Sequence, residues 1–524
     1  MQDTPEQTAI FKAGLETNTS LMINAYAGTG KTTTITKLAT LLDAQGKGGG
    51  VALAFNTKIK QELERRFPKT FTVMTLNGLG HRAWGRAIGK SLRLEERKLG
   101  LLVTEALKPY SLPKETWDDV RRLVTGAMQK GLVPSEYPHK GLLSDTVGNW
   151  SNIADDLWIG ANETTIQLAR QVLIQNIKQA FDGVISFDDQ IYCSAMLGGV
   201  FPRFALVLGD EAQDWSPLNH IQLAKTASDR IIAVGDPKQS LYAFRGADSS
   251  SMTNLRKLRK EWIDLPLATT FRCPKVIVAR QQGHAPGFLA YHANPQGAVH
   301  NGSHYTIREG ELEFGTRAKD SVEISWTWDD VKALGFEKVA ILSRNNAQLI
   351  SMAFKLLRQQ IGVRMQGRDI GKGLIALSKK ILPDDTTVAG ECANAIEAWK
   401  NRECDLAYAN SHEEKVAGIT DRAESLMAVL ESAMVENAGQ LRKQLEFLFS
   451  KDTGQVLLST IHRAKGMEWP LVIHLDPWRI PSKHARKAAA EGNPTPLDQD
   501  RNAVYVCETR AQEVLILANL QDFH

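Results

Sequence analysis

The sequence has few cysteines and no long apolar run. Its five cysteines, Cys193, Cys273, Cys392, Cys404 and Cys507, are far apart, and no two have the spacing of zinc ligands. We therefore expect neither a disulfide framework nor a structural metal site, as in proteins of a reducing compartment. No stretch of about 18 apolar residues is present, so no membrane-spanning helix is expected. The first residues, MQDTPEQTAIF, do not resemble a secretory signal.

The sequence also lacks a strong excess of one charge. Its 63 Lys and Arg residues against 59 Asp and Glu residues give a net charge of +4. Composition alone therefore does not indicate a nucleic-acid partner, and any basic surface has to be local. The length of 524 residues is enough for several domains at about 100–200 residues each. We find neither internal repeats nor low-complexity segments.

Short apolar runs alternate with helical patterns along much of the chain. This alternation predicts α/β domains with parallel sheets and crossover helices. The expected strands are Leu21–Asn24, Val51–Phe55, Val73–Leu76, Phe204–Leu208 and Ile231–Val234, and, in a second region from about Leu265, Val339–Leu342, Val456–Ser459, Leu471–Leu475 and Val514–Leu517.

Two stretches interrupt this alternation with apolar residues at helical spacing. Leu99, Val103 and Leu107 show this spacing in the first stretch, and Leu441, Leu445 and Leu448 show it in the second. We therefore expect two α/β domains that each carry a helical insertion. The expected division is residues 1–88 and 185–264 for the first domain with insertion 89–184, and residues 265–375 and 452–524 for the second with insertion 376–451.

A glycine-rich segment, AYAGTGKT at residues 25–32, follows the first expected strand and precedes a helical pattern. This is the context of a phosphate-binding loop. Gly28 and Gly30 allow the backbone to approach phosphate closely, and the helix N-terminus supplies positive potential. We expect Lys31 to reach the β- and γ-phosphates and the Thr32 hydroxyl to bind Mg²⁺.

Two adjacent carboxylates follow the expected strand Phe204–Leu208, in the segment GDEAQD. In a phosphate-loop hydrolase, Asp210 would hold Mg²⁺ directly or through water, and Glu211 would orient and deprotonate the attacking water. By itself this segment also fits an acidic loop after a core strand. The phosphate-binding loop upstream favours the catalytic interpretation.

The strand Ile231–Val234 leads into GDPKQSLYAFRGAD. The amide of Gln239 could reach a γ-phosphate from this position. Tyr242, Phe244 and Arg245 are residue types that stack on bases and pair with phosphates. Spacing alone also allows these aromatic rings to be core residues.

Together these segments resemble, in order, the motifs of superfamily 1 DNA helicases of the UvrD/PcrA/Rep type. The resemblance covers nearly the whole chain, including the family's habitual Ala at position 25. Each motif alone is weak to moderate evidence, but their common order is specific. Further matching segments are TPEQ with Gln7, LAFNTK with Phe55, TLNG with Asn77, TTFR with Phe271 and Arg272, AILSRNNAQ with Arg344, STIHRAKGMEW with His462, Gly466 and Glu468, and VYVCETRA with Arg510.

The resemblance implies roles at the ATP site. Gln7 would read adenine and Phe271 would stack on it. Glu468 would hydrogen-bond the ribose beside Gly466, and Arg272 and Arg510 would contact the γ-phosphate from the second domain. With Mg²⁺ at Thr32 and Asp210, and Lys31, Asp210, Glu211, Gln239, Arg272 and Arg510 as catalytic residues, the implied ATP-binding residues are Gln7, Ala27, Gly28, Thr29, Gly30, Lys31, Thr32, Thr33, Phe271, Gly466 and Glu468.

The resemblance also implies contacts with DNA. Phe55, Tyr242 and Phe244 match base-stacking positions, and Asn77, Arg245, Arg344 and His462 match other DNA-contacting positions. There are departures from the family pattern. Thr33 stands where some relatives have Arg, Asn77 replaces a usual His, and the second insertion is short.

Two basic segments could add phosphate contacts. Lys58, Lys60, Arg65 and Arg66 lie on an expected helix, where a solvated charged face is the alternative. Arg479, Lys483, Arg486 and Lys487 lie in an expected loop, where the alternative is a surface with no partner.

The sequence thus predicts an ATP- and Mg²⁺-dependent motor on single-stranded DNA, most simply a 3′-to-5′ helicase. A translocase that strips proteins from DNA and unwinds poorly stays open, as does a nucleotide-dependent binding switch. RNA is chemically compatible as the track, although the resemblance favours DNA. The expected partners are single-stranded DNA and single-strand/duplex junctions, with a loader or regulatory protein left open. We expect a monomer in the cytoplasm, associated with the nucleoid, in repair, recombination, replication or defence.

Overall fold

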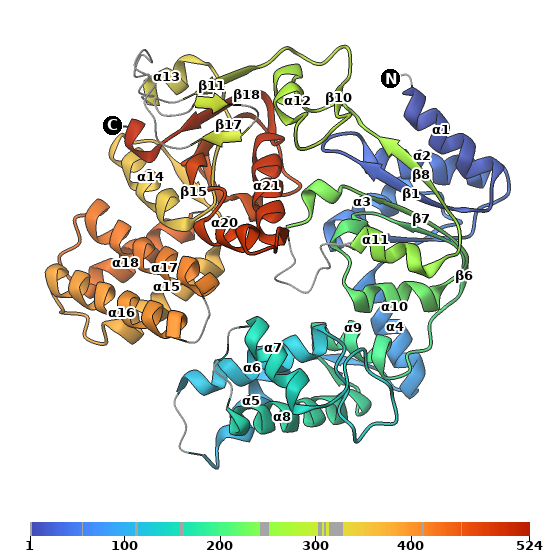
Figure 1. The fold of residues 1–524 in the computed structure, drawn as a ribbon, viewed down its shortest axis with the longest axis horizontal. Coiled ribbons are helices and arrows are strands. Elements are labelled where there is room, and N and C mark those ends of the chain that lie inside the picture. Colours follow the sequence, from blue (N-terminus) through green and yellow to red (C-terminus); the bar gives the residue numbers. More distant parts are fainter. Residues whose placement is uncertain are drawn as a thin grey trace. The chain divides into compact units, whose positions relative to one another are not determined.

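The computed structural model describes residues 3–54, 56–110, 114–157, 159, 162–241, 251–301, 306–308, 311–313, 328–409, 413–451 and 453–523. The chain divides into two compact units, Met1–Ala268 and Thr269–His524. Each unit contains a six-stranded sheet with helices packed against it (Figure 1). Every pairing between neighbouring strands of both sheets is parallel. The expected α/β class with two parallel-sheet domains is confirmed.

The sheet of the first unit has the strand order β3-β2-β6-β7-β1-β8. Successive side chains of its strands point to opposite faces, and both faces are covered. Leu21 and Ile23 belong to the apolar cluster on one face, and Met22 belongs to the cluster on the other. The strands are β1 (Ser20–Ala25), β2 (Val51–Ala54), β3 (Thr72–Thr75), β6 (Phe204–Gly209), β7 (Ala227–Gly235) and β8 (Trp262–Leu267).

The strand order brings the important loops of this unit together. Strands β6, β7 and β1 are neighbours, so the segments after their carboxyl ends emerge at one edge of the sheet. The helices of this unit are α1 (Pro5–Glu16), α2 (Lys31–Ala44), α3 (Thr57–Arg66), α4 (Leu76–Ile88), α9 (Phe187–Met196), α10 (Pro217–Thr226) and α11 (Ser251–Leu255), with 3₁₀ turns η1 (Ala212–Asp214), η2 (Pro237–Gln239) and η4 (Arg256–Leu258).

The first insertion is helical, as expected. It consists of α5 (Lys98–Leu107), α6 (Lys114–Gln129), α7 (Val147–Leu157) and α8 (Glu163–Phe181), with the short strands β4 (Arg93–Leu94) and β5 (Val184–Ile185) at its base. Its apolar core includes Val103, Leu123, Trp150 and Leu173. A buried ion pair lies beside this core, where Lys98 Nζ is 2.6 Å from Asp189 Oδ2 and donates to Asn176 O at 2.8 Å.

We expect Lys98→Met to loosen the first insertion, because it leaves the buried Asp189 carboxylate without its cation. Removing one member of a buried pair costs about 3–5 kcal/mol. Hydrogen exchange in α5 and α8 should accelerate by about 10²-fold or more. Lys90→Met is the control, since the Lys90–Asp182 pair is exposed and such pairs contribute about 1 kcal/mol or less. Equal exchange rates in the two variants would contradict the expectation.

The sheet of the second unit has the order β11-β18-β17-β14-β16-β15. Its strands are β11 (Ala298–Asn301), β14 (Val339–Ser343), β15 (Val363–Met365), β16 (Val456–Thr460), β17 (Trp469–Leu475) and β18 (Ala511–Ala518). One continuous apolar cluster joins a face of this sheet to the second insertion, from Ile341 and Ile473 on the sheet to Leu426 and Leu445 on helices. The insertion is therefore anchored through the core of the unit.

The remaining elements of the second unit flank this sheet. Two short ladders pair β9 (Thr269–Thr270) with β10 (Leu289–Ala290), and β12 (Thr306–Arg308) with β13 (Glu311–Glu313). The helices are α12 (Lys275–Gln281), α13 (Trp328–Ala333), α14 (Asn346–Arg358), α15 (Arg368–Ile381), α16 (Ala389–Ala409), α17 (Glu413–Ser432), α18 (Ala438–Ser450), α19 (Ile461–Ala464), α20 (Lys483–Ala490) and α21 (Thr495–Glu508), with 3₁₀ turns η5 (Pro477–Arg479) and η6 (Leu520–Asp522).

The structure differs from the sequence expectations at several boundaries. Leu76 begins α4 instead of ending a strand, because the Thr75 hydroxyl caps this helix by accepting from Gly78 N at 3.0 Å. The expected start of the second domain near Leu265 falls inside β8, which pairs with β1. The basic segment expected as a loop contains α20, where the Ser482 hydroxyl accepts from Ala485 N at 3.2 Å.

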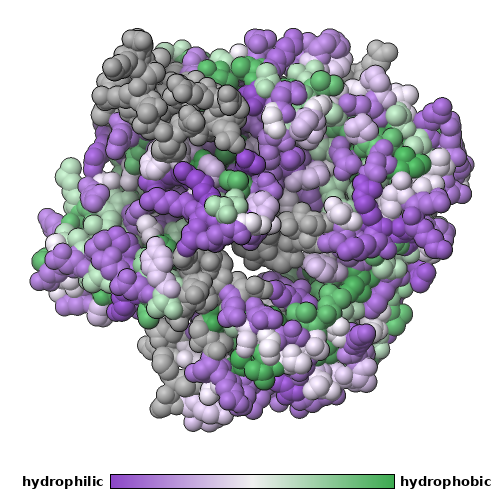
Figure 2. All heavy atoms as spheres, in the orientation of Figure 1, coloured by the Kyte–Doolittle hydropathy of each residue, from purple (hydrophilic) through white to green (hydrophobic). Residues whose placement is uncertain are grey.

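In the part of the chain that the structure describes, no helix combines the length and apolar character needed to span a bilayer. The face drawn in Figure 2 carries mainly hydrophilic side chains, with hydrophobic ones in small patches. Among the described residues, no three His, Cys, Asp or Glu side chains gather as a metal cage.

Candidate nucleotide and nucleic-acid site

The glycine-rich segment forms a loop between β1 and α2. Gly28 and Gly30 have φ angles of 69° and 77°, in the left-handed region that favours glycine. Helix α2 starts at Lys31, directly after Gly30, and no side chain caps its N-terminus. Thr29 is buried, and its hydroxyl donates to Tyr26 O at 2.9 Å. The loop thus presents the amides of a helix start, which is the usual setting for phosphate.

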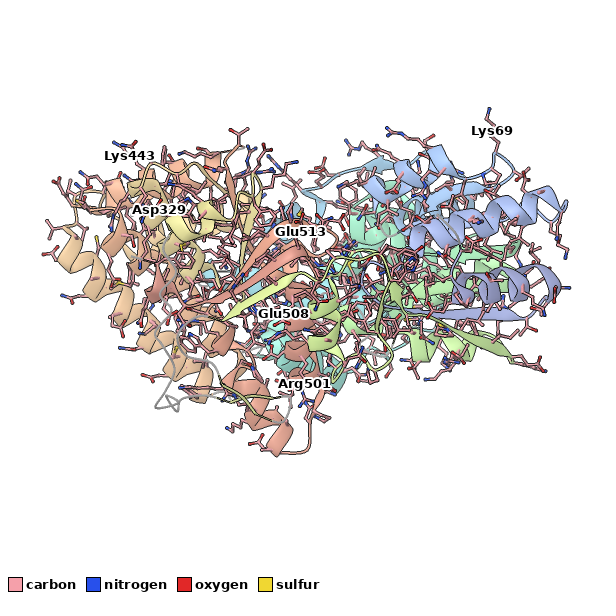
Figure 3. All side chains as sticks on the ribbon, turned by 90° about the horizontal axis from the view of Figure 1, so that it is seen from above. Lys69, Asp329, Lys443, Arg501, Glu508 and Glu513 are labelled. Atoms are coloured by element: carbon pink, nitrogen blue, oxygen red, sulfur yellow. The ribbon has the colours of Figure 1, made fainter. Side chains whose placement is uncertain are left out.

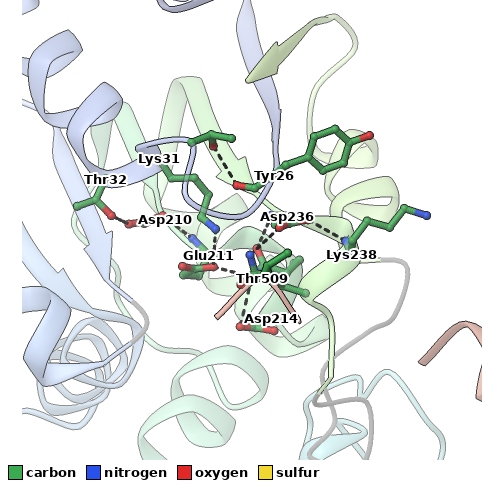
Figure 4. A network of polar contacts seen from close by, with 12 residues as sticks. Tyr26, Lys31, Thr32, Asp210, Glu211, Asp214, Asp236, Lys238 and Thr509 are labelled. Atoms are coloured by element: carbon green, nitrogen blue, oxygen red, sulfur yellow. Dashed lines mark hydrogen bonds and ion pairs between the residues drawn. The ribbon is translucent and has the colours of Figure 1, made fainter. Parts of the chain in front are cut away.

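The acidic pair after β6 lies beside this loop. The Thr32 hydroxyl donates to Asp210 Oδ2 at 2.8 Å, and Lys31 Nζ is 3.6 Å from Glu211 Oε2 (Figure 4). Asp210 is 1% exposed, whereas the Glu211 side chain keeps 21% exposure. The structure therefore brings Lys31, Thr32, Asp210 and Glu211, from two distant segments, together.

The electrostatics of this cluster fit a divalent cation. Burial, and then the neighbouring charge of Glu211, raises the pKa of Asp210 to about 6, although Lys31 opposes the rise. Burial also raises the pKa of Asp236. Mg²⁺ is typically held by one or two carboxylates together with phosphate oxygens. The Thr32 hydroxyl and the Asp210 carboxylate are oxygen donors of the required kind and lie within hydrogen-bond distance of each other.

A chain of side-chain contacts runs from Glu211 to Gln239. Gln213 Nε2 donates to Glu211 Oε2 at 2.6 Å, and Gln213 Oε1 accepts from Asp236 N at 3.0 Å. Gln239 Nε2 then donates to Asp236 Oδ2 at 2.6 Å. Glu211 itself has a φ of 53°, which is uncommon for a residue other than glycine. The acidic pair and Gln239 are thus parts of one hydrogen-bonded array.

Gln213 and Asp236 are two residues of this array that sequence reasoning missed. Both lie inside segments that it singled out, GDEAQD and GDPKQ, but no sequence pattern shows that they pair. Gly235 makes the pairing sterically feasible, because a Cβ at this position would lie 2.7 Å from Gln213 Oε1.

Two other residues expected at the nucleotide have partners within the first unit. Gln7 is the third residue of α1, where its side chain and that of Thr4 form a capping box. Its Nε2 donates to Thr34 Oγ1 at 3.1 Å. Thr33 Oγ1 accepts from Arg66 Nη2 at 3.1 Å. Gln7 is therefore tied to the first turn of α2, which begins at the end of the phosphate-binding loop.

In the second unit, two of the expected nucleotide residues contact each other. Arg272 and Glu468 form an ion pair. Gly466 has a φ of 81°, in the left-handed region that favours glycine. Arg510 is 1% exposed and donates from Nε to Val506 O at 2.9 Å and from Nη1 to Met467 O at 3.1 Å. Arg510 is thereby joined to the segment that contains Gly466 and Glu468.

The ring of Phe271 belongs to a small aromatic cluster. Its centroid lies 5.0 Å from that of Tyr291, which in turn lies 4.1 Å from the ring of His292. Phe271 is partly exposed. A partly exposed ring supported by a second ring is a suitable stacking surface for a base.

Four of the expected DNA contacts, Phe55, Tyr242, Phe244 and Arg245, lie outside the described residues. The other three are described. Asn77 Nδ2 donates to Phe187 O at 3.0 Å. Arg344 follows β14 and pairs with Asp500, and His462 lies on α19 directly after β16, the neighbour of β14.

Phe187 is a further candidate that the sequence analysis missed. It begins α9, its carbonyl accepts from Asn77, and it is 51% exposed. Its exposed ring belongs to a residue in contact with Asn77, which is expected at the DNA, and is therefore available for stacking. The basic residues of α3 contribute less to this argument, since Lys60 pairs with Glu64 and Arg66 with Glu62 on an exposed face. These pairs favour the solvated charged face.

The fold and the loop after β1 define a phosphate-loop protein of the α/β class. Two family models then match the chain: the UvrD/REP helicase N-terminal domain at residues 4–260 and the UvrD-like helicase C-terminal domain at residues 406–522. The chain belongs to the UvrD/Rep family of superfamily 1 helicases.

Curated relatives match along most of this chain at low identity. The F-box DNA helicase protein 1 of Schizosaccharomyces pombe is 24% identical over 98% of this chain and 57% of its own length. The ATP-dependent DNA helicase UvrD2 of Mycobacterium tuberculosis is 24% identical over 94% of this chain and 75% of its own length. The ATP-dependent DNA helicase UvrD1 of the same species is 29% identical over 47% of this chain. This chain thus spans little more than half of the fission yeast relative.

Proposed function

We propose that this protein is an ATP-driven motor that moves 3′-to-5′ along single-stranded DNA and separates the strands of a duplex. The observation that carries the proposal is the cluster of Lys31, Thr32, Asp210 and Glu211 at the carboxyl edge of the first sheet. These side chains supply cation, hydroxyl and carboxylates at the start of α2, and ATP hydrolysis requires this set of groups.

In this proposal the first unit binds and hydrolyses ATP. The amides of residues 27–30 and the Lys31 ammonium bind the phosphates, and Thr32 and Asp210 hold Mg²⁺. When bound, Mg²⁺ neutralises phosphate charge and orients the phosphate oxygens. Glu211 accepts a proton from the attacking water, and the amide of Gln213 holds the Glu211 carboxylate in place. In this proposal the Gln239 amide contacts the γ-phosphate, and Gln7 and Thr33 lie near the base.

The second unit contributes the remaining groups in this proposal. Arg272 and Arg510 stabilise the charge that develops on the γ-phosphate, as arginine fingers do. Glu468 binds the ribose beside Gly466, and Phe271 stacks on the adenine. Because ATP would be contacted by residues of both units, binding and hydrolysis can bias their arrangement. Residues 89–184 and 376–451 serve as the two insertions of the motor.

The hydrogen-bonded array from Glu211 to Gln239 suggests how ATP hydrolysis is coupled to the DNA contacts. Gln239 directly precedes the segment with Tyr242, Phe244 and Arg245, which we propose as DNA contacts. Phe55, Asn77, Arg344 and His462 complete the set, with Phe187 beside Asn77. Stacking on aromatic rings is largely independent of base sequence, at about 1–3 kcal/mol per base. The proposed track is therefore single-stranded DNA of any sequence.

Strand separation on tailed duplexes tests the proposal directly. With ATP and Mg²⁺, duplexes that carry a 3′ single-stranded tail should be unwound, and duplexes with a 5′ tail or blunt ends should not. A non-hydrolysable ATP analogue is the control for hydrolysis. Unwinding only from the 5′ tail would contradict the polarity.

The same assay separates the alternatives. Failure to unwind either duplex, with ATPase activity still stimulated by single strands, would favour a translocase that displaces proteins from DNA. DNA binding that depends on nucleotide without any turnover would favour a switch. Displacement of streptavidin from biotinylated single strands would then distinguish movement from binding alone.

A further inference from the structure

A buried ion pair in the second unit connects the two segments that carry Arg272 and Arg510. Arg280, on α12, donates from Nε to Glu508 Oε2 at 2.7 Å. Its neighbour Gln281 donates from Nε2 to the same oxygen at 2.5 Å. Helix α12 begins three residues after Arg272, and Glu508 is two residues before Arg510. The carboxylate of Glu508 thus joins the chain near one arginine to the chain near the other.

The pair is deeply buried, so its two charged groups must stay in contact for either to remain stable. The side chain of Glu508 is 1% exposed and that of Arg280 is 15% exposed. Burial lowers the pKa of Arg280, but the charge and hydrogen bond of Glu508 more than offset this and raise it above its ordinary value. A buried carboxylate is stable only with well-placed donors, and removing its partners leaves an uncompensated charge. The pair therefore holds α12 and α21 in a defined relation.

The other contacts between the segments around α12 and α21 fix their relative position less tightly. Tyr505, on α21, packs against the rings of His284 and Phe288, with centroids 5.9 and 6.1 Å away. Such apolar contacts tolerate sliding because they are weakly directional. His284 Nε2 also lies 2.9 Å from Asn502 Oδ1, one to two helical turns before Glu508. The contact nearest to Arg510 is the weak one between Cys273 Sγ and Thr509 O, at 3.7 Å.

The neighbouring histidine does not compete for Glu508. His474, on β17, is completely buried, and its pKa is lowered to about 3 by burial and then by the positive charge of Arg280. Its ring is therefore neutral near pH 7. Among the described residues, Arg280 is the cation that forms an ion pair with Glu508.

The end of α21 transmits this placement to Arg510. Glu508 is the last residue of the helix, Thr509 is its C-cap, and Arg510 follows. Arg510 donates to Val506 O within the helix and to Met467 O outside it. A rotation or shift of α21 would therefore move the Arg510 guanidinium relative to Arg272 and Glu468.

We propose that Glu508 is a positioning residue that sets the relative placement of Arg272 and Arg510. It touches neither ATP nor DNA and acts through α12 and the end of α21. This inference rests on the proposed function, because it assigns both arginines to the γ-phosphate.

Glu508→Gln tests this role, because the amide keeps the size of the side chain and removes its charge. The single-strand-stimulated kcat for ATP should fall by about tenfold or more, since small displacements of catalytic groups have effects of this size. The KM for ATP and the Kd for single-stranded DNA should change by about twofold or less. Glu513→Gln is the control, because Glu513 is exposed on β18 of the same unit (Figure 3). A kcat for Glu508→Gln equal to that of Glu513→Gln would overturn the inference.

A double-mutant cycle distinguishes positioning from general damage. In an Arg510→Ala background, Glu508→Gln should cause little further loss of kcat, measured with labelled ATP to detect slow turnover. An equal loss in both backgrounds would overturn the inference. If Glu508→Gln does not fold, Arg280→Lys replaces it, since it keeps the charge and loses the Nε donor. The same kcat loss is expected, and control-level kcat for that variant would overturn the inference.

The failure of the proposed function gives a different pattern. If Arg510→Ala hydrolyses ATP at the wild-type rate, the role of Arg510 itself is wrong. If Arg510→Ala is slow and Glu508→Gln matches its control, only the positioning role of Glu508 is wrong.

Discussion

The Lys31→Ala variant is expected to lose ATP turnover and to bind ATP more weakly. The Lys31 ammonium is the cation at the start of α2, 3.6 Å from Glu211, and no other residue of the phosphate-binding loop carries a positive charge. Removing one preorganised group that stabilises transition-state charge costs about 10²–10³-fold in kcat. The measurement is phosphate release in the presence of saturating single-stranded DNA, together with equilibrium binding of a fluorescent ATP analogue.

A matched control for this variant lies on the same helix. Lys37→Ala removes a lysine of α2 whose ammonium is exposed and pairs with Asp3 at 2.6 Å. It should keep the wild-type turnover and ATP affinity. Near-normal turnover in Lys31→Ala would remove the phosphate-loop assignment, and equal losses in both variants would indicate damage to α2 instead of a missing phosphate contact.

The Glu211→Gln variant is expected to bind ATP and DNA but not to hydrolyse ATP. An amide cannot accept the proton of the attacking water, so turnover should fall by about 10²-fold or more. The fold of the site should survive, because the amide oxygen of the variant can still accept from Gln213 Nε2. Because hydrolysis is blocked, the protein should accumulate in an ATP-dependent complex with single-stranded DNA.

Two measurements check this expectation. Phosphate release gives the turnover, and the dissociation rate from labelled single-stranded DNA, with and without ATP, gives the trapped complex. Glu261→Gln is the control, since Glu261 is an exposed carboxylate of the same unit. If Glu211→Gln hydrolyses ATP at the wild-type rate, the water-activating role belongs to another residue.

Much of the fold was predictable because its signals are local. Most of the predicted strands lie wholly within observed strands, as Val339–Leu342 does in β14 and Leu471–Leu475 in β17, since continuous apolar runs bounded by polar residues mark the buried strands of parallel sheets. Among the strands of the two six-stranded sheets, β8, β11 and β15 were missed. All three lie at a sheet edge, where little of this apolar signal is required, and β11 and β15 are also short.

The residues of the candidate site also fall into those that the sequence could predict and those that it could not. Lys31, Thr32, Asp210 and Glu211 could be singled out from two short segments, because each segment has a recognisable composition after an apolar strand. The contacts of Gln213 with Asp236 and of Glu508 with Arg280 could not be predicted. Each joins side chains that are distant in sequence, and the pairing depends on which strands and helices become neighbours.

The sequence by itself determined the class of the fold, the phosphate-binding loop and the family. Their signals are local in the sequence: the apolar strand runs, the glycine-rich turn and the order of the motifs. Only the tertiary structure decided the order β3-β2-β6-β7-β1-β8, which gathers the loops after β1, β6 and β7 at one edge. It also decided which buried polar groups pair, as in Lys98 with Asp189 and Arg280 with Glu508. The physical reason is that a buried charge requires a partner from whichever element packs beside it, and packing is a property of the whole fold.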